Sequence, residues 1–467
     1  MRTGCRIVVG ICGAALLYGC ASTMTYKQQF VGIDEKLRAQ DYGKALSQIR
    51  SAKNTFYKRK DQILYYLDLG MLSHFDGSWD DSNEALSRAE EAIEMAYTRS
   101  VSRATASVML NDNTLEYAGE DHEDVYLNVF KALNYLKLGA PDEAMVEVRR
   151  IGNKLNLLED RHAQMAAGYN RSEHRGKRFR QGHNRFYDSA LARYLSMLMY
   201  RANGQWDDAR IDLDHIRELW HRASHVYSFR MPPFDTVLDP CPDGYAKLNV
   251  ISFFGRCPDK FARTLYIHTQ PRSITIAATQ QTSYQHHKVK ALEVIPWAGK
   301  DPLPVGTQLK FQVPYMKRRG TQVRRIRLLL NGREVRSFST IESMEKVADQ
   351  TFKVKEPLLY LKTITRAVAK GVARAQAVAE LQRHRDGQKV PIFLVDAMFA
   401  ATENADLRVS QFFPAVAGIC EIDVPEGQHR VSVAYYDRNG NRIFTDDLGT
   451  IDVSRERLNL LESCYLN

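Results

Sequence analysis

The chain has 467 residues and carries 65 Lys and Arg against 55 Asp and Glu, which gives a formal net charge of +10 at pH 7. A hydrophobic fraction of 44% excludes a disordered tail, and the length suits two or three domains with sizeable cores. The basic balance favours polyanionic neighbours such as lipid headgroups or acidic proteins.

The first twenty residues form a targeting segment that ends at Cys20. Arg2 and Arg6 precede an apolar stretch at residues 7–17, which leads through Gly19 to the cysteine. A stretch this short cannot span ~30 Å of hydrocarbon as a helix. A charged region, a short apolar region and a small residue before a cysteine resemble the lipobox of bacterial lipoproteins.

The lipobox resemblance implies that residues 1–19 are removed and that Cys20 carries the acyl chains, with residues 20–30 as a tether. Cleavage removes two arginines and no acid, so the mature net charge is +8. No Asp follows the cysteine, which by the enterobacterial pattern implies sorting to the outer membrane. We therefore expect a lipid-anchored protein that faces the periplasm, where nucleic acid is not a partner. An ordinary secretory signal cleaved near Ala21 is the alternative.

Residues 31–230 are predicted to form a helical domain, because apolar residues recur there at helical spacing. A short signature recurs between the helices: a turn residue, an aromatic residue or proline, acidic residues and an alanine. It occurs at residues 41–45, 79–86, 138–144 and 203–209. Glycine ends one helix, acids favour the next N-terminus, and alanine permits close packing.

The recurring signature resembles tetratricopeptide repeats, with irregular spacing. By that resemblance Tyr42, Trp79 and Trp206 are the residues that pack the repeats together. A generic helical bundle is the alternative interpretation.

Residues 240–467 are predicted to form a β-rich domain after a proline-rich break that starts at Pro232. Asn331 and Gly332 suit a type I′ turn between two strands. The predicted strands cover residues 247–254, 264–269, 273–278, 309–315, 323–330, 334–338, 418–424, 430–436, 442–444 and 458–465. The expected fold class is therefore α+β and multidomain, with a helical repeat region followed by a β-rich region.

A helical insertion at about residues 356–402 is expected to interrupt the β-rich domain. Pro357 suits the first turn of a helix that runs to about residue 384. Residues 390–401 are apolar enough to form a second helix, which would complete a helical hairpin.

Four cysteines remain in the mature chain beside the lipidated one, an even number in an oxidising compartment. Four cysteines allow three pairings. The sequence favours Cys241–Cys257, which closes a short loop, and Cys420–Cys464, which joins two late strands. Four free thiols are the alternative.

Two basic segments are candidate contact surfaces. The first is a stripe whose members are four residues apart on one predicted helix: Lys362, Arg366, Lys370 and Arg374. Like charges at this spacing repel, so the stripe suggests an anionic partner, either acids elsewhere in this protein or a membrane or protein surface, with a solvated face as the alternative. The second is a basic loop that could contact lipid phosphates or an acidic protein: Arg171, Arg175, Lys177, Arg178 and Arg180.

Catalytic signatures are missing from the sequence. It contains no G-x-S-x-G, Walker A, H-E-x-x-H, dinucleotide or zinc-type cysteine pattern, so we expect no enzyme, cofactor or metal site. His221 and His225 are four residues apart but have no evident third ligand, which favours surface or capping roles. Asp396, Glu403 and Asp406 could work as paired acid and base, but helix termination and a loop salt bridge to Arg408 are the favoured roles.

Five segments resemble a family of uncharacterised bacterial lipoproteins that join a tetratricopeptide-like helical region to a C-terminal β region. They are residues 183–186, 254–260, 365–370, 405–408 and 424–429. Arg185 stands where that family usually has proline. The resemblance implies an accessory role in the cell envelope, because the genes of this family often lie beside envelope lipoproteins.

Three functions follow as hypotheses. The first is a non-enzymatic scaffold or regulator that binds envelope proteins, for example those of cell-wall synthesis. The second is a glycan-binding module in the β domain, for which the candidate aromatic residues are Trp297, Tyr315, Phe412 and Phe413. The third is an unrecognised hydrolase, which would need a convergence of polar residues that the sequence does not indicate.

Overall fold

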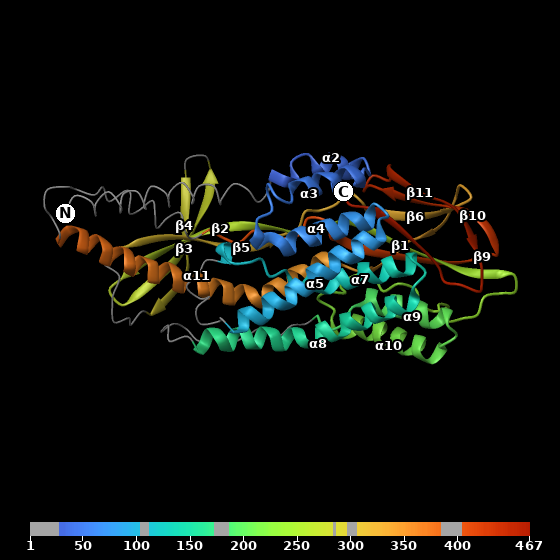
Figure 1. Ribbon diagram of the computed structural model, residues 1–467, viewed down its shortest axis with the longest axis horizontal. Helices are drawn as coiled ribbons and strands as arrows, with labels where there is room; N and C mark the ends of the chain where they lie inside the picture. Colours follow the sequence, from blue (N-terminus) through green and yellow to red (C-terminus); the bar gives the residue numbers. More distant parts are fainter. Residues whose placement is uncertain (1–27, 103–111, 172–185, 284–285, 297–305, 384–403) are drawn as a thin grey trace.

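The computed structural model describes residues 28–102, 112–171, 186–283, 286–296, 306–383 and 404–467. Within these residues the fold is α+β, as predicted: helices fill the first half, and the strands of the second half form three sheets. The molecule is elongated, with a broad body at one end and a narrower arm at the other (Figure 1).

The helices of the first half form one layer of the body (Figure 1). They are α2 (Ile33–Arg38), α3 (Tyr42–Ala52), α4 (Gln62–Phe75), α5 (Trp79–Ser102), α7 (Asp121–Lys137), α8 (Pro141–Arg171), α9 (Ala190–Ala202) and α10 (Trp206–Arg222), with short 3₁₀ turns η1 (Gln28–Phe30), η2 (Arg59–Asp61) and η3 (Asp112–Thr114).

The turn chemistry of the recurring signature is found where it was predicted. Gly139 and Gly204 follow α7 and α9 with φ of 74° and 72°, a left-handed conformation that favours glycine. The Asp41 side chain accepts a hydrogen bond from the Lys44 backbone N–H at 3.0 Å and caps α3. Trp206 is 48% exposed, so it does not pack between helices as expected.

A central sheet lies against the helical layer. Its strand order is β12 (Asn459–Tyr465), β1 (Tyr245–Arg256), β9 (Pro414–Pro425) and β8 (Ser339–Glu342). Strand β1 is parallel to β12 and antiparallel to β9. Ile251 and Phe253 of β1 share one core with the helices, whereas Leu248 and Val250 point to the opposite face. Both faces of this sheet are therefore covered.

A second sheet covers the far face of the central sheet. Its order is β11 (Arg442–Val453), β10 (Gly427–Tyr436), β6 (Arg325–Leu330) and β7 (Arg333–Ser337). Leu328, Val433 and Tyr435 pack in one core with Leu248 and Val250 of β1. The predicted turn between β6 and β7 is present, with positive φ at Asn331 and Gly332. The body thus has three layers: helices, the central sheet and the second sheet.

The arm consists of a third sheet and one long helix. The strand order is β4 (His286–Pro296), β3 (Ser273–Ser283), β2 (Asp259–Gln270) and β5 (Gln308–Lys317), and the helix is α11 (Met344–Arg383). Leu265 and Phe311 pack against Ile364 and Val368 of α11. At 1.5 Å per residue, the 40 residues of α11 span about 60 Å. The helix therefore runs from the body along the arm (Figure 1).

The helical insertion begins earlier than the sequence suggested. Pro357 lies inside α11 rather than at its first turn, because the helix starts at Met344. Ala348 and Phe352 are buried four residues apart ahead of the proline, so core packing sustains the helix through it. The second helix, predicted at residues 390–401, falls outside the described residues.

The four cysteines are free thiols, so neither favoured disulfide is found. Cys420 and Cys464 lie on β9 and β12, the two neighbours of β1, and strands two apart are separated by roughly 9.6 Å. A disulfide requires Cα atoms within about 7 Å. Cys241 and Cys257 flank the two ends of β1, whose 12 residues span roughly 40 Å.

Candidate functional site

The helical layer meets the first part of the arm at a region that we call the junction. A cavity of about 510 Å³ lies there. Residues of α5, α7, α8, β2, β5 and α11 line it, together with residues 112–120 and 404–406. Apolar side chains contribute part of the wall, namely Ile93, Ala96, Met165 and Leu359. The rest of the wall is strongly charged, and most of these charges form ion pairs.

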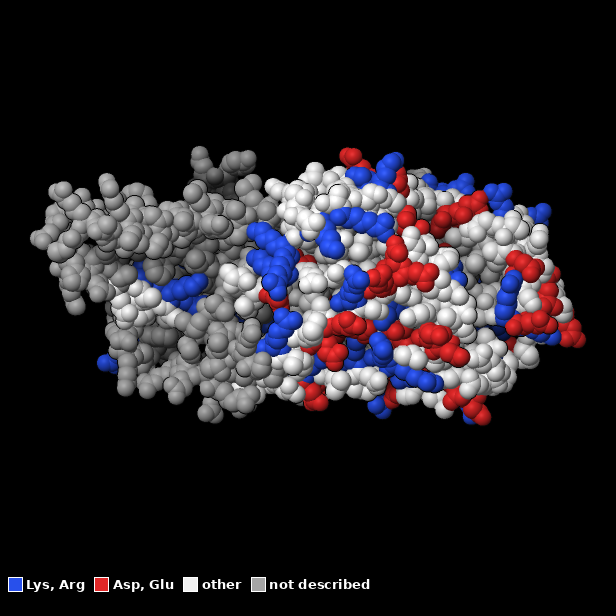
Figure 2. Space-filling view, in the orientation of Figure 1, with Lys and Arg blue, Asp and Glu red and all other residues white. Residues whose placement is uncertain are grey.

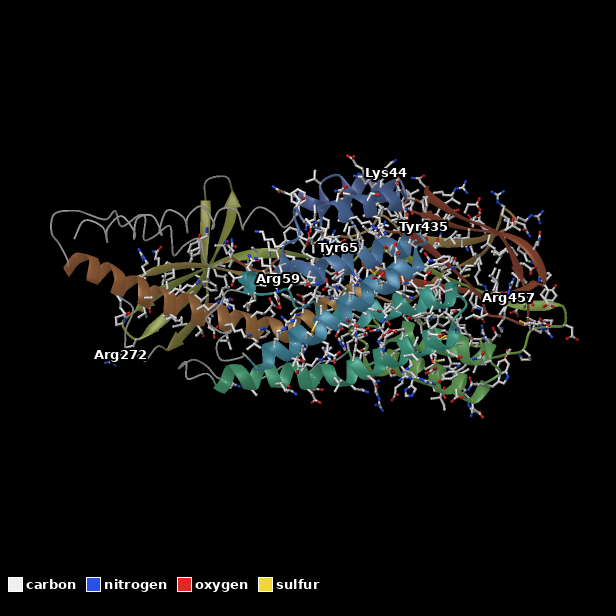
Figure 3. All side chains as sticks on the ribbon, viewed as in Figure 1. Lys44, Arg59, Tyr65, Arg272, Tyr435 and Arg457 are labelled. Carbon is white, nitrogen blue, oxygen red and sulfur yellow. The ribbon has the colours of Figure 1, made fainter. Side chains whose placement is uncertain are left out.

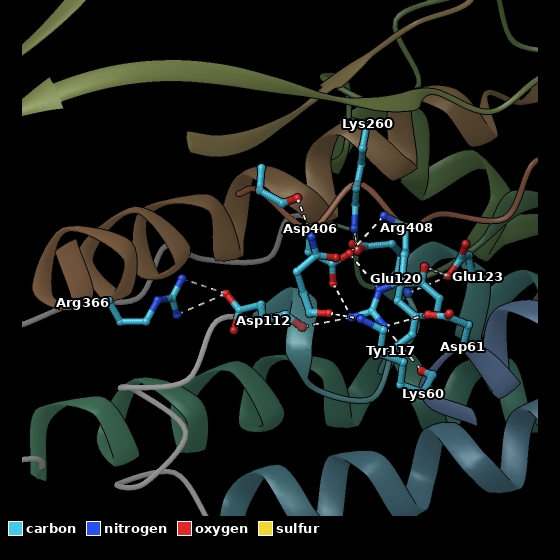
Figure 4. Close-up of polar contacts among 12 residues, drawn as sticks. Lys60, Asp61, Asp112, Tyr117, Glu120, Glu123, Lys260, Arg366, Asp406 and Arg408 are labelled. Carbon is cyan, nitrogen blue, oxygen red and sulfur yellow. Dashed lines mark hydrogen bonds and ion pairs between the residues drawn. The ribbon is translucent and has the colours of Figure 1, made fainter. Parts of the chain in front are cut away.

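Glu120 is the centre of the ion-pair cluster (Figure 4). It precedes α7, and its carboxylate contacts the Lys260 ammonium of β2 and, at 2.5 Å, the Lys355 ammonium of α11. The Glu120 and Lys260 side chains are 6% and 5% exposed. Burial favours the neutral acid, but Lys260 and Lys355 more than offset it and lower the pKa of Glu120. One carboxylate therefore ties the helical layer to both elements of the arm.

Asp121 and Asp124, in the first turn of α7, extend the cluster to α8. Asp121 contacts the His162 ring at 3.0 Å, and Asp124 contacts Lys154 at 2.7 Å and Arg161 at 2.9 Å. Burial favours the neutral acid, but nearby positive charge lowers the pKa of Asp121. Carboxylates at a helix N-terminus also interact favourably with the helix dipole.

Arg408 forms a second group of ion pairs and hydrogen bonds beside Glu120, here called the Arg408 clamp (Figure 4). Its guanidinium donates to Asp406 at 2.9 and 2.8 Å, to Asp61 at 3.0 Å and to the backbone carbonyl of Asp112 at 3.0 Å. The side chain is 4% exposed. The salt bridge of Asp406 with Arg408 is thus confirmed. Because Arg408 also contacts Asp61 and Asp112, it connects the segment that precedes β9 to residues near α4 and η3.

Two buried carboxyl groups share Ser410, which lies in the same segment. The Ser410 hydroxyl donates to Asp68 at 2.7 Å, and the Ser410 backbone N–H donates to Glu123 at 2.6 Å. Tyr57 and Tyr117 donate to the same two carboxyl groups at 2.8 and 2.6 Å. Burial raises the pKa of Asp68 and of Glu123 to about 7 each. These groups therefore titrate near neutrality.

The predicted basic stripe is not a uniform exposed face. Arg366 is buried and its guanidinium lies 3.4 Å from Asp112 (Figure 4). Lys362 lines the cavity, one turn before Arg366. Lys370 and Arg374 are partly buried further along α11. The first two members therefore face the interior of the junction.

Other predicted residues are dispersed or lie outside the described ranges. Cys20, Trp297 and residues 172–185 of the basic loop are outside them; Arg171 is the last residue of α8. Phe412 and Phe413 are fully buried in the core, so they cannot contact a glycan as one hypothesis required. Tyr315 lies beside Phe261, with ring centroids 6.1 Å apart.

No group of three or more metal-ligating side chains is found among the described residues. None of the described helices is both long and apolar enough to cross a bilayer.

Comparisons with known proteins do not place this chain in a family. No protein-family model matches it. Neither the curated proteins nor the solved structures contain a significant match.

Proposed function

We infer that this protein is a lipid-anchored, non-enzymatic scaffold or accessory factor of a bacterial envelope assembly, held at the outer membrane and facing the periplasm. The lipobox-like sequence that ends at Cys20 supports the anchor and the compartment. The elongated body and arm support a scaffold, because they offer well-separated surfaces on one molecule (Figure 1). Envelope proteins, including those of cell-wall synthesis, are the proposed partners.

The scaffold proposal rests on a group of exposed cations beside a cleft in the helical layer. The cleft has a volume of about 310 Å³ and lies between the start of α4 and α5. Tyr66 and Met95 line it, and Met95 is 52% exposed. Arg59 lines the cleft and is exposed, as is the preceding residue, Lys58, and neither forms an ion pair in the described part of the chain.

Two further basic residues lie over tyrosine rings of α4. Lys53 lies over the Tyr65 ring at 5.2 Å, and Arg88 over the Tyr66 ring at 5.6 Å. Figure 2 shows lysine and arginine side chains gathered over this part of the surface, and Figure 3 places Arg59 and Tyr65 there. Arg88 also pairs with Glu84, but the unpaired Lys58 and Arg59 lie on a surface with aromatic and thioether groups, which suits an acidic protein segment with apolar side chains.

Lipidation is tested first, by metabolic labelling with radioactive palmitate. We expect the wild-type chain to be labelled and to fractionate with outer membranes, and Cys20→Ala to do neither. A labelled Cys20→Ala protein, or an unlabelled wild type, would contradict both the lipid anchor and the proposed location.

Partner binding is tested by a crosslinking pull-down from envelope fractions with the lipidated chain. We expect the recovered envelope proteins to be lost in a Lys58→Glu, Arg59→Glu double variant. Arg272→Glu, an exposed change on the arm, is the matched control (Figure 3). Equal recovery with all three chains would contradict the proposed surface, and copurified glycan without protein would favour the glycan-binding alternative.

A further inference from the structure

The cavity at the junction has the size and the mixed wall of a small-molecule site. Its volume of about 510 Å³ lies within the ~300–1,000 Å³ typical of ligand pockets. Ile93 and Ala96 of α5 face it from one side, and Leu359 of α11 from another. Met165 of α8 adds a flexible apolar surface that adapts to different shapes. Part of the wall therefore suits a hydrocarbon group.

Not every charge that lines the cavity has an opposite partner among the described residues. Nearly every charged side chain of the wall has an opposite partner. The pairs are Arg99 with Glu116, Arg161 with Asp124, Lys260 and Lys355 with Glu120, His162 with Asp121, Arg366 with Asp112, and Arg408 with Asp406. Lys362 is the exception among the described residues, because it forms neither an ion pair nor a hydrogen bond there.

The Lys362 ammonium group is partly removed from water in the cavity wall. Burial lowers the pKa of its ammonium group, and the positive charge of Arg366, one turn away, lowers it further. The carboxylate of Asp112 raises this pKa only in part, because it already contacts Arg366 at 3.4 Å. A lysine side chain normally extends its charge into water, and a desolvated charge without a partner is unfavourable.

We propose that this cavity binds an amphiphilic anion, whose single charged headgroup pairs with Lys362 and whose apolar chain lies against Ile93, Met165 and Leu359. The headgroup is a carboxylate or a phosphate ester, since either accepts hydrogen bonds from an ammonium group. The bound anion supplies the opposite charge that Lys362 lacks among the described residues. This site goes beyond the scaffold function and does not depend on it.

The test measures binding by calorimetry on the full chain with Cys20→Ala, which has no acyl chains of its own. The probes are dodecanoate, dodecyl phosphate, neutral dodecanol and inorganic phosphate, below micellar concentrations. We expect the two amphiphilic anions to bind at least tenfold more tightly than dodecanol or inorganic phosphate. A preference between the two anions would identify the source as a fatty acid or a phospholipid. Equal affinity for dodecanol and dodecanoate would overturn the proposal.

Lys362→Met is the decisive variant, because it keeps the length of the side chain and removes the charge. We expect it to weaken anion binding at least tenfold, to the level of dodecanol, while its thermal unfolding midpoint stays equal or rises. Lys353→Met is the matched control: this exposed lysine lies on the same helix and pairs with Asp349 at 2.8 Å. Unchanged anion binding in Lys362→Met would overturn the assignment of the headgroup site.

Discussion

In the apolar core, the Phe130 ring lies 4.9–6.1 Å from the rings of His74, Phe75, Phe253 and Phe413. At the junction, by contrast, the Glu120 carboxylate lies between two ammonium groups. Both regions are buried, but burial stabilises the first and penalises the second. An ion pair needs specific partners at specific positions, whereas apolar groups need only contact. The core therefore supplies stability, and the junction fixes how the arm is oriented on the body.

The largest expected effect is in the core. Phe130→Ala removes a fully buried ring between the helices and β1 and leaves a cavity. We expect the free energy of unfolding to fall by about 4 kcal/mol, within the range for large-to-small core changes. Urea unfolding followed by circular dichroism measures it. A loss below about 1 kcal/mol would mean that this core is not the main source of stability.

A slightly smaller loss is expected at the junction. Arg408→Met keeps much of the side-chain volume but leaves Asp61 and Asp406 without their cation. Removing one partner of a buried ion pair typically costs about 3 kcal/mol or more, because the remaining charge is uncompensated. Urea unfolding gives the change, and limited proteolysis reports whether the arm separates from the body first. Unfolding of both parts together, with no loss of stability, would refute the proposed role of the clamp.

The pH dependence distinguishes the two regions further. The folded-state pKa values of Asp68 and Glu123, about 7, lie above their unfolded values, so stability is lost as the pH rises through 7. Burial also lowers the pKa of His122 to about 4, but this opposite effect acts only below about pH 6.5. We expect the free energy of unfolding to fall by about 1–2 kcal/mol from pH 6.5 to 8.

The pH control is the double variant Asp68→Asn, Glu123→Gln, which keeps most of the hydrogen bonds around Ser410. Urea unfolding at several pH values should show that the fall above pH 6.5 disappears in this variant. If the same fall remains, other groups cause it.

Features that depend on local periodicity could be predicted from the sequence, such as the strand β1 and the turns at Gly139 and Gly204. The junction could not. Lys260 and Lys355 are distant in sequence from Glu120, and only the packing of α11 and β2 against α7 brings them together. The stripe that begins at Lys362 was recognised by its spacing, but spacing does not show which side of a helix is buried. The short strand β8 has too few residues to show a period.

The smallest expected effect is at an exposed ion pair. Its loss of stability is a reference for the loss expected at the junction. Arg430 and Asp447 are 2.6 Å apart on neighbouring strands, but their side chains are 67% and 48% exposed. We expect Arg430→Ala to cause only a small loss of stability at low salt, because water screens an exposed pair. In 1 M salt, where the Debye length is about 3 Å, the cost should vanish, whereas the cost of Arg408→Met should largely persist. Urea unfolding at both salt concentrations measures the two differences. If Arg408→Met were as salt-sensitive as Arg430→Ala, the clamp would be accessible to water and the contrast between junction and surface would fail.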